Sequence, residues 1–375
     1  MKCSFSSQVF MRLLSIILCL SSTLTSTMAA TSKSARWHPG NYILLGFGSS
    51  DENVKYWLNY SPLFRGVQVT YKWKDLEPSK NQYDFSSIKR HMQLAKNAHK
   101  YLWVQIQYKG FSANPYEVCP TYLVGSPKPG GGNYSAFFTF PKQSGQLAKQ
   151  PALWDPAVEA RVEALLSRMG EALSADPNIS ALEGVNTPES TNPGKPEVVA
   201  QQPNVMPVDK DRSNQHIIDR AKAFNKSFPH TQVICFMNGI MPTASVPDNR
   251  AMVTKLIPEG IGFGGPDLRR WDSNLVGKVY SQCPFLAGKV SMGFAVQWTD
   301  TMHPSKGGAL VNDTIENVRD TYALAKELGL NYVFWQNRPG YINLVQQHLN
   351  SPEIKVDPAG GLVKKYPASL TPYLN

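Results

Sequence analysis

Cysteine is scarce in this chain of 375 residues, which has 5, and no long hydrophobic run follows its first 30 residues. The second absence excludes a stable membrane insertion, because a helix that crosses a bilayer needs about 20 apolar residues. No CxxC, HExxH or EF-hand spacing occurs among the cysteines, histidines and acidic residues. We therefore expect neither a metal nor any other cofactor.

Signatures of several other protein classes are also missing. The chain has no G-x-S-x-G nucleophile elbow and no G-x-G-x-x-G dinucleotide motif. Its net charge is +10, but the basic residues are scattered, and no nucleic-acid-binding pattern occurs. The charge thus indicates a solvated surface and no nucleic-acid partner. A hydrophobic share of 42% without short repeats excludes disorder and fibrous structure.

The first 30 residues have the pattern of an export signal. Lys2 and Arg12 accompany an apolar run at 13–20, and a small-residue cleavage site follows near Ala29 and Ala30. We therefore expect a secreted or periplasmic protein after signal removal. Its net charge falls to +8, because the segment holds two basic residues and no acid.

Three cysteines remain after this segment, too few for a disulfide scaffold. Cys235 lies in an apolar run, which is typical of a buried thiol. Cys119 and Cys283 lie in predicted loops and are the more plausible disulfide pair.

Eight short apolar runs, rich in Val, Ile and Phe, alternate with helical periodicities from residue 43 onward. Such runs are typical of parallel strands with crossover helices. The sequence therefore predicts an α/β fold, a single (β/α)8 TIM barrel over residues 31–375 with long loops on its C-terminal face. The predicted strands are 43–47, 66–71, 102–107, 181–186, 232–237, 260–263, 290–296 and 332–335.

The segments between these strands are unequal. Helices are predicted from Asp84, from Asp155-Pro156, over about 213–225 and over about 311–328. Connections from helix back to strand are short, whereas the loops after the strands are long, and barrels of this kind carry their sites on those loops. The long loops are 108–153, 187–211, 238–248, 264–274 and 298–308.

One acidic residue follows the fourth predicted strand at its C-terminal end. Glu189 stands there among polar residues, where partial burial would let it protonate a leaving oxygen. Glu183 lies inside the same apolar strand and points to the opposite face from Asn186. We interpret Glu183 as a structural, paired carboxylate.

Amides, acids and tryptophans recur at the other strand ends. Sugar binding needs flat apolar faces for ring C–H groups and amide or carboxylate groups for hydroxyls, and this inventory supplies both. A lone Trp is as often core packing as ligand contact, so the argument rests on their recurrence at one predicted rim. The residues are Trp73, Gln105, Gln107, Asn238, Asp267, Gln297, Trp298, Asp300, Trp335, Gln336 and Asn337.

The chain resembles the clan A glycoside hydrolases, which are retaining enzymes with a (β/α)8 barrel. The resemblance rests on Trp73 to Pro78 (WKDLEP) with Tyr83 to Phe85 (YDF), on the fourth-strand end 185–189, and on 333–335 (VFW). It implies that Glu189 is the acid/base, although Thr187-Pro188 stands between it and Asn186, where the family has Asn and Glu adjacent. It also implies that the aromatic residue closing the eighth strand, Trp335, lies under the sugar.

The seventh strand departs from the family. It presents Gln297 where the family has a nucleophilic Glu, and an amide cannot form the glycosyl ester. Asp267, after the sixth strand, is the best substitute carboxylate, and Asp300 is second. A separation near 6.5 to 9.5 Å from Glu189 would suit an inverting mechanism. Pairing of Asp267 with Arg269 or Arg270 is an equal alternative.

These observations predict a monomeric enzyme that cleaves glycosidic bonds in a poly- or oligosaccharide. Glu189 would be the general acid, and Asp267 the second carboxylate. Two alternatives stay open: a carbohydrate-binding barrel that lost its nucleophile, and a polysaccharide lyase that acts on uronates. The predicted substrate-binding residues are Trp73, Gln107, Asn186, Asn238, Gln297, Trp298, Trp335 and Gln336.

Overall fold

Eight parallel strands close into a barrel at the centre of the fold, as the sequence predicts. The computed structural model describes residues 33–123, 134–141, 145–189, 199–237, 246–297 and 313–373. The expected export signal lies outside these residues. The barrel strands, in order around the closed sheet, are β2 (Gly40–Phe47), β3 (Gly66–Lys72), β4 (Tyr101–Gln107), β7 (Leu182–Asn186), β8 (Gln232–Phe236), β9 (Gly262–Gly265), β10 (Met292–Val296) and β11 (Tyr332–Gln336).

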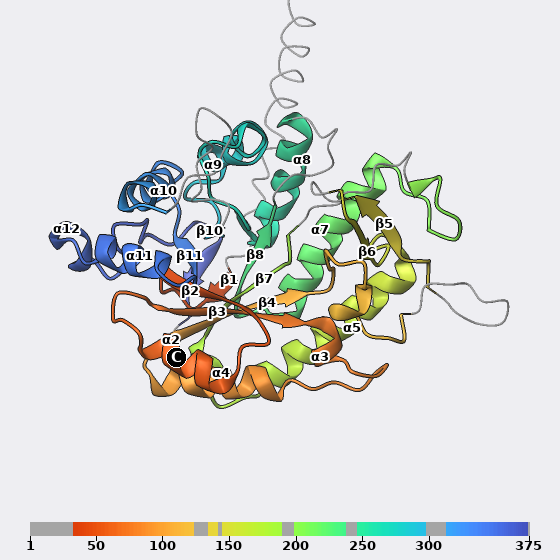
Figure 1. The fold of residues 1–375 in the computed structure, drawn as a ribbon, viewed down its shortest axis with the longest axis horizontal. Coiled ribbons are helices and arrows are strands. Elements are labelled where there is room, and N and C mark those ends of the chain that lie inside the picture. Colours follow the sequence, from red (N-terminus) through yellow and green to blue (C-terminus); the bar gives the residue numbers. More distant parts are fainter. Residues whose placement is uncertain are drawn as a thin grey trace, which may run out of the picture. The chain divides into compact units, whose positions relative to one another are not determined.

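Helices surround the barrel (Figure 1). The strongest sequence signal, Asp155-Pro156, does begin a helix, and the Asp155 side chain accepts a hydrogen bond from the Ala157 amide. None of the helices in the described part of the chain is long and apolar enough to cross a membrane. The helices are α2 (Asp51–Asn59), α3 (Trp73–Leu76), α4 (Ser86–Asn97), α5 (Pro156–Ser174), α7 (Lys210–Ser227), α8 (Val246–Leu256), α9 (Cys283–Leu286), α10 (Ile315–Glu327), α11 (Tyr341–Leu349) and α12 (Pro352–Lys355).

Aromatic side chains fill the barrel interior. Alternate residues of a strand face opposite sides, so every second residue of each barrel strand points inward. Trp103 packs edge-on against Tyr332 and Phe334, with ring centroids 4.9 and 5.3 Å apart. Gly184 makes room for Trp103, because a Cβ at that glycine would lie 2.2 Å from the indole ring. The barrel is therefore a packed core without a pore.

Glu183 is buried near the start of β7 and is paired, as the sequence indicates. The prediction that it points away from the face of Asn186 is wrong, because an irregularity where β7 pairs with β4 brings Glu183 against side chains of the barrel interior. Its carboxylate accepts hydrogen bonds from the His38 amide (2.6 Å), the Tyr332 hydroxyl (2.8 Å) and the Gln232 amide (3.1 Å). The second carboxylate oxygen lies 2.7 Å from Nδ1 of His38. These contacts satisfy the carboxylate inside the fold, so Glu183 is structural.

Two of the long predicted loops fold onto each other. The loop after β4 contains an antiparallel hairpin, β5 (Phe138–Pro141) and β6 (Leu147–Gln150), which the sequence did not predict. Phe138 and Trp154 form a small apolar cluster with Val199 and Val205 from the loop after β7. This cluster fixes one wall at the C-terminal end of the barrel.

A second unpredicted pairing joins the two ends of the described chain. β1 (Lys33–Ala35) runs parallel to β12 (Leu370–Pro372) in a separate two-stranded sheet. The Lys33 amide also donates to the Ser369 carbonyl at 2.9 Å.

The disulfide suggested for Cys119 and Cys283 is wrong. Both thiols are free and buried, as is that of Cys235. Cys119 follows β4 and donates to the Tyr108 carbonyl at 3.3 Å, whereas Cys283 begins α9. Burial raises the pKa of Cys235 and of Cys283 to about 12, so both remain protonated thiols at neutral pH.

Candidate active site

Amide side chains line the interior of the barrel toward its C-terminal mouth. Gln68 of β3 donates to Asn186 of β7 at 2.8 Å, and this bond crosses the interior because β4 lies between the two strands. Next to it, Thr70 donates to Gln105 at 3.1 Å. Gln68 Oε1, Asn186 Nδ2 and Gln336 Oε1 are buried without a hydrogen-bond partner among the described residues. The mouth thus keeps unused donors and acceptors, which a polar ligand or water can satisfy.

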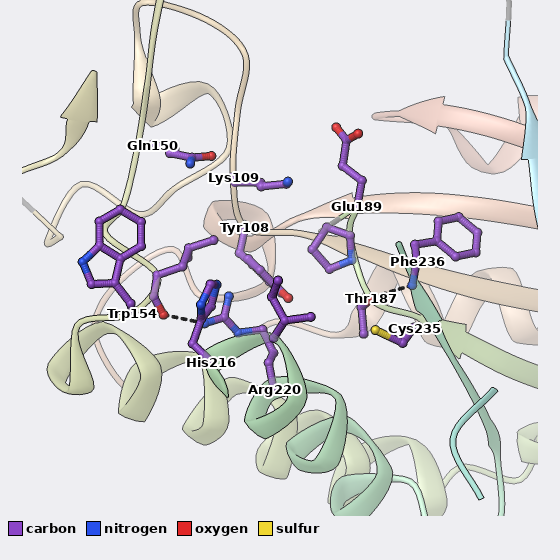
Figure 2. Close-up of a pocket in the computed structure, with 13 residues that line it drawn as sticks. Tyr108, Lys109, Gln150, Trp154, Thr187, Glu189, His216, Arg220, Cys235 and Phe236 are labelled. Carbon is purple, nitrogen blue, oxygen red and sulfur yellow. Dashed lines mark hydrogen bonds between the residues drawn. The ribbon is translucent and has the colours of Figure 1, made fainter. Parts of the chain in front are cut away.

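Glu189 stands at this mouth, three residues beyond the end of β7. The Thr187 amide donates to the Ile234 carbonyl (3.1 Å), and the Thr187 hydroxyl accepts from the Phe236 amide (2.9 Å), which ties the chain to β8. Thr187 and Pro188 are buried, and Glu189 is partly exposed. The anchored strand end therefore presents the carboxylate at the barrel surface, away from His216 and Arg220 (Figure 2).

Below Glu189 lies a small recess between the ends of β4, β7 and β8 and helix α7. It has a volume of about 30 Å³, which is room for about one water molecule and too small for a sugar ring. Lys109, His216 and Arg220 line it, and the Arg220 guanidinium donates to the Leu153 carbonyl at 2.6 Å. A sugar must therefore bind outside the recess, on the mouth side of Glu189.

Lys109 is the residue of this site that sequence reasoning missed. Its side chain is 2% exposed, directly after β4, and its ammonium lies 5.7 Å from the Phe111 ring centroid. Burial lowers the pKa of Lys109 to about 8, and the neighbouring Glu189 carboxylate opposes this shift. Burial likewise holds the pKa of His216 well below its usual value, so its imidazole is neutral at pH 7. The signal in the sequence was a lone lysine directly after an apolar strand.

Asp267 and Gln297 follow the neighbouring strands β9 and β10. Oδ1 of Asp267 lies 3.9 Å from Nη1 of Arg269, whose shorter contact, 2.9 Å, goes to Asp272. The ion pair with Arg269 that the sequence left open is therefore present, at the long limit for such a contact. Gln297 donates to the Pro266 carbonyl at 3.0 Å, beside Asp267.

The structure contradicts the expected exposure of two tryptophans. Trp73 and Trp335 are both 0% exposed. The Trp73 indole donates to Glu77 (2.9 Å), and the Trp335 indole donates to Asn41 (2.9 Å) and stacks on Tyr322. Trp335 points outward because its neighbours on β11, Phe334 and Gln336, point into the barrel. Neither ring offers a face to a sugar.

The other predicted binding residues differ in whether their side chains are exposed at the mouth. Gln336 is partly exposed at the mouth, whereas Gln107 is buried and donates to the Lys109 carbonyl at 2.7 Å. Gln107 thus shapes the turn that carries Lys109. Asn238 and Trp298 lie outside the described residues, as does Asp300, the second choice of partner carboxylate.

Two phenylalanines at the rim supply the exposed aromatic surface that Trp73 and Trp335 do not. Phe47 is 50% exposed and Phe111 is 39% exposed. A bulge in β2 pairs Phe47 with Thr70, an inward-facing position of β3, so the irregularity turns Phe47 toward the mouth. The Lys72 ammonium lies 5.4 Å from its ring centroid. No local sequence pattern signalled this bulge.

The motif that carries the family resemblance has a structural role. The buried Glu77 carboxylate accepts hydrogen bonds from Trp73, from the Asn81 amide (2.9 Å) and from the Tyr122 hydroxyl (2.6 Å), and it forms an ion pair with Arg161. These contacts join α3 and the turn after it to the loop after β4 and to α5.

The described residues contain no group of three His, Cys, Asp or Glu side chains that could hold a metal ion.

Comparison with one solved structure supports the same architecture. The chain is similar to the catalytic domain of β-amylase from Paenibacillus polymyxa, with a TM-score of 0.53 and 10% identity over 88% of this chain and 96% of that one. The chain has this barrel fold. The exo-β-1,4-mannosidase Op5Man5 from Opitutaceae bacterium strain TAV5 gives a TM-score of 0.47 at 13% identity, over 92% of this chain and 60% of the mannosidase. No family model and no curated protein matches the sequence.

Proposed function

We propose that this protein is an exported, monomeric glycoside hydrolase that cleaves glycosidic bonds in a poly- or oligosaccharide. The observation that carries the proposal is Glu189, a partly exposed carboxylate on an anchored strand end at the C-terminal mouth of the barrel. A carboxylic acid in this position can protonate the leaving glycosidic oxygen. The barrel fold shared with a β-amylase catalytic domain is compatible with this activity and does not establish it.

The surroundings of Glu189 suit a sugar. Gln105, Asn186 and Gln336 bring amide groups to the mouth for hydroxyl recognition, and Phe47 and Phe111 provide flat apolar faces at the rim. The small recess behind Glu189 can hold a water molecule. In this proposal the saccharide lies across the mouth, between the two phenylalanines and the carboxylate.

The test replaces Glu189 by Gln and measures reducing ends released from a panel of neutral and uronate-containing polysaccharides. We expect Glu189→Gln to lower kcat by about 10²- to 10⁴-fold, because the amide cannot donate the proton. The dissociation constant for the same polysaccharide should change less than about threefold. Glu163→Gln, on the outer surface of α5, is the control and should keep wild-type activity. Full activity in Glu189→Gln would refute the assignment.

The contacts of Asp267 favour a second candidate, a carbohydrate-binding barrel without catalysis. Its carboxylate lies 3.9 Å from the Arg269 guanidinium, and the family resemblance implies that Gln297 stands where the family has its nucleophile. If Asp267 is the second carboxylate, Asp267→Asn should lower kcat as strongly as the change at Glu189. If the wild type binds a polysaccharide without releasing reducing ends, the binding barrel is correct. Unsaturated products that absorb in the near ultraviolet would instead identify a lyase.

A further inference from the structure

A second pocket, of about 420 Å³, opens at the opposite end of the barrel strands from Glu189. We call it the N-terminal pocket, because its walls come from residues that begin strands: 36–38 before β2, Tyr101 at the start of β4, and Ala181 before β7. The C-terminal end of α4 and Tyr373 complete it. It shares no lining residue with the recess below Glu189.

The lining of the N-terminal pocket is strongly basic. Arg36, Lys96 and Lys100 contribute cations, and two imidazoles, those of His38 and His99, stand beside them. No Asp or Glu occurs among the described residues that line the pocket. The carboxylate behind His38, that of Glu183, does not line the pocket, although its charge acts on Arg36. It accepts hydrogen bonds from His38, Tyr332 and Gln232.

Arg36 is the best-formed part of this pocket. Its side chain is 7% exposed, and its guanidinium lies 4.7 Å from the Tyr373 ring centroid. Its Nε is buried without a hydrogen-bond partner among the described residues. A buried guanidinium N–H without an acceptor is costly, and an oxyanion is the acceptor that a guanidinium binds most strongly.

Both lysines are oriented by one backbone contact each. Lys96 donates to the Pro177 carbonyl at 2.8 Å, and Lys100 donates to the Ser61 carbonyl at 2.6 Å. An ammonium has three N–H donors, so these contacts fix its position without using all of them. Burial lowers the pKa of Lys100 to about 8, a shift that a bound anion would oppose.

We propose that the N-terminal pocket binds a sulfate or phosphate group, either as the free ion or carried on a saccharide. The cations supply the charge and the N–H donors that a tetrahedral oxyanion needs. Tyr101, stacked on His38 with ring centroids 3.7 Å apart, and Tyr373 add aromatic walls, and the volume exceeds that of the ion alone. This binding does not depend on the activity proposed for Glu189.

The test is calorimetric titration of the full chain at constant ionic strength with sodium sulfate, sodium phosphate, glucose 6-sulfate, glucose 6-phosphate and glucose. We expect saturable binding of the anions and none of glucose. The double variant Lys96→Gln/Lys100→Gln should weaken the affinity about tenfold or more, since two charged donors are lost. Lys89→Gln is the matched control, on the same helix but outside the pocket, and should bind within twofold of wild type.

The outcomes separate the sources of the anion. Tighter binding of the sugar esters than of the free ions identifies a saccharide-borne group, and equal affinities identify the free ion. Circular dichroism checks the fold of each variant, and the exposed change Lys96→Gln alone serves if the double variant does not fold. Absence of saturable binding to any anion, or an equal loss in Lys89→Gln, would overturn the proposal.

Discussion

Lys109 shows how a single buried charge makes the stability of the fold depend on pH. Its ammonium sits in a recess with the cation of Arg220 and the carboxylate of Glu189 around it. Burial disfavours the charged form, which lowers the pKa of Lys109 from 10.5 to about 8. The unfolded chain therefore binds more protons at this residue than the folded chain does between pH 8 and 10.5.

The first prediction follows from this difference. Over that interval the free energy of unfolding should rise with pH, because the unfolded state is the one that holds the extra proton. The Lys109 contribution between pH 8 and 9.5 is about 2 kcal/mol. In Lys109→Met, urea unfolding at these two pH values should show a rise smaller by that amount. Lys55→Met, an exposed change, should keep the wild-type rise, and an unchanged rise in Lys109→Met would contradict the prediction.

A second prediction concerns the rim. Phe47→Ala should weaken polysaccharide binding about tenfold, because the half-exposed ring is the face that a sugar would stack on. The free energy of unfolding should change little, since the ring is not in the core. Binding to the Glu189→Gln background isolates this effect from turnover. Tyr56→Ala removes a similarly exposed ring on α2, outside the mouth, and should bind as wild type does.

The residues of the site could be predicted from the sequence only in part. Glu189 could be placed at the mouth because it follows an apolar strand directly. The side on which Trp335 lies could not be predicted. Successive residues of a strand face opposite sides of the barrel wall, so an error of one residue in the predicted register moves a side chain from the inside to the outside. Phe47 reaches the mouth through a bulge, and the burial of Lys109 depends on α7 and on the loop around β6, far along the chain.

At the scale of elements, Glu77 holds α3, the loop after β4 and α5 in one arrangement. Three hydrogen bonds and the Arg161 ion pair meet on its buried carboxylate. These elements also carry the wall beside Glu189, so the junction at Glu77 helps to position that wall. Trp73, Leu76 and Glu77 of the motif are fully buried, which suits a structural role.

The third prediction tests this junction. Glu77→Gln should lower the free energy of unfolding by about 3 kcal/mol, because it leaves the largely buried Arg161 guanidinium without its counter-charge. Urea unfolding at pH 7 measures the change. Glu171→Gln breaks an ion pair with Arg168 on the exposed face of α5 and should cost less than about 1 kcal/mol. If both substitutions lower the free energy of unfolding equally, the buried ion pair stabilises the fold no more than the exposed one.

The elements themselves were predictable where local signals were strong. All eight barrel strands were found because each lies in a short apolar run between more polar segments. α7 begins at Lys210, earlier than predicted, because the Asp209 side chain caps it by accepting from the Arg212 amide at 2.7 Å. The hairpin of β5 and β6 escaped prediction, since its four-residue strands are stabilised by an apolar cluster shared with residues 199–208.

For the whole molecule, the packed interior separates the two ends of the barrel. Glu189 stands at the mouth, and the N-terminal pocket lies beyond the aromatic layer of Trp103, Tyr332 and Phe334. The two ends of the described chain meet on the N-terminal side, where β12 is the partner of β1 and leads directly to Tyr373 of the pocket. Stability of that side therefore depends on the last residues of the described chain.

The fourth prediction removes this pairing. Deletion of residues 370–375 should lower Tm by roughly 5 °C, because Leu370 loses its buried position and Lys33 to Ala35 lose their backbone partners. Differential scanning calorimetry measures the shift. Thr371→Ala keeps the backbone pairing and changes only an exposed side chain, so its Tm should stay within about 1 °C of wild type. An unchanged Tm in the deletion variant would show that the sheet of β1 and β12 contributes nothing to thermal stability.

The partnership of β1 and β12 also has a consequence for how a ribosome makes this protein. Lys33 pairs with Leu370, so β1 is synthesised long before its partner strand β12. At about 5 to 20 residues per second, that wait is roughly 20 to 70 s. During this time the N-terminal strand has no native partner. Chaperones can thus meet a nascent chain whose β1 and β12 sheet forms only after residues 370–372 have been synthesised.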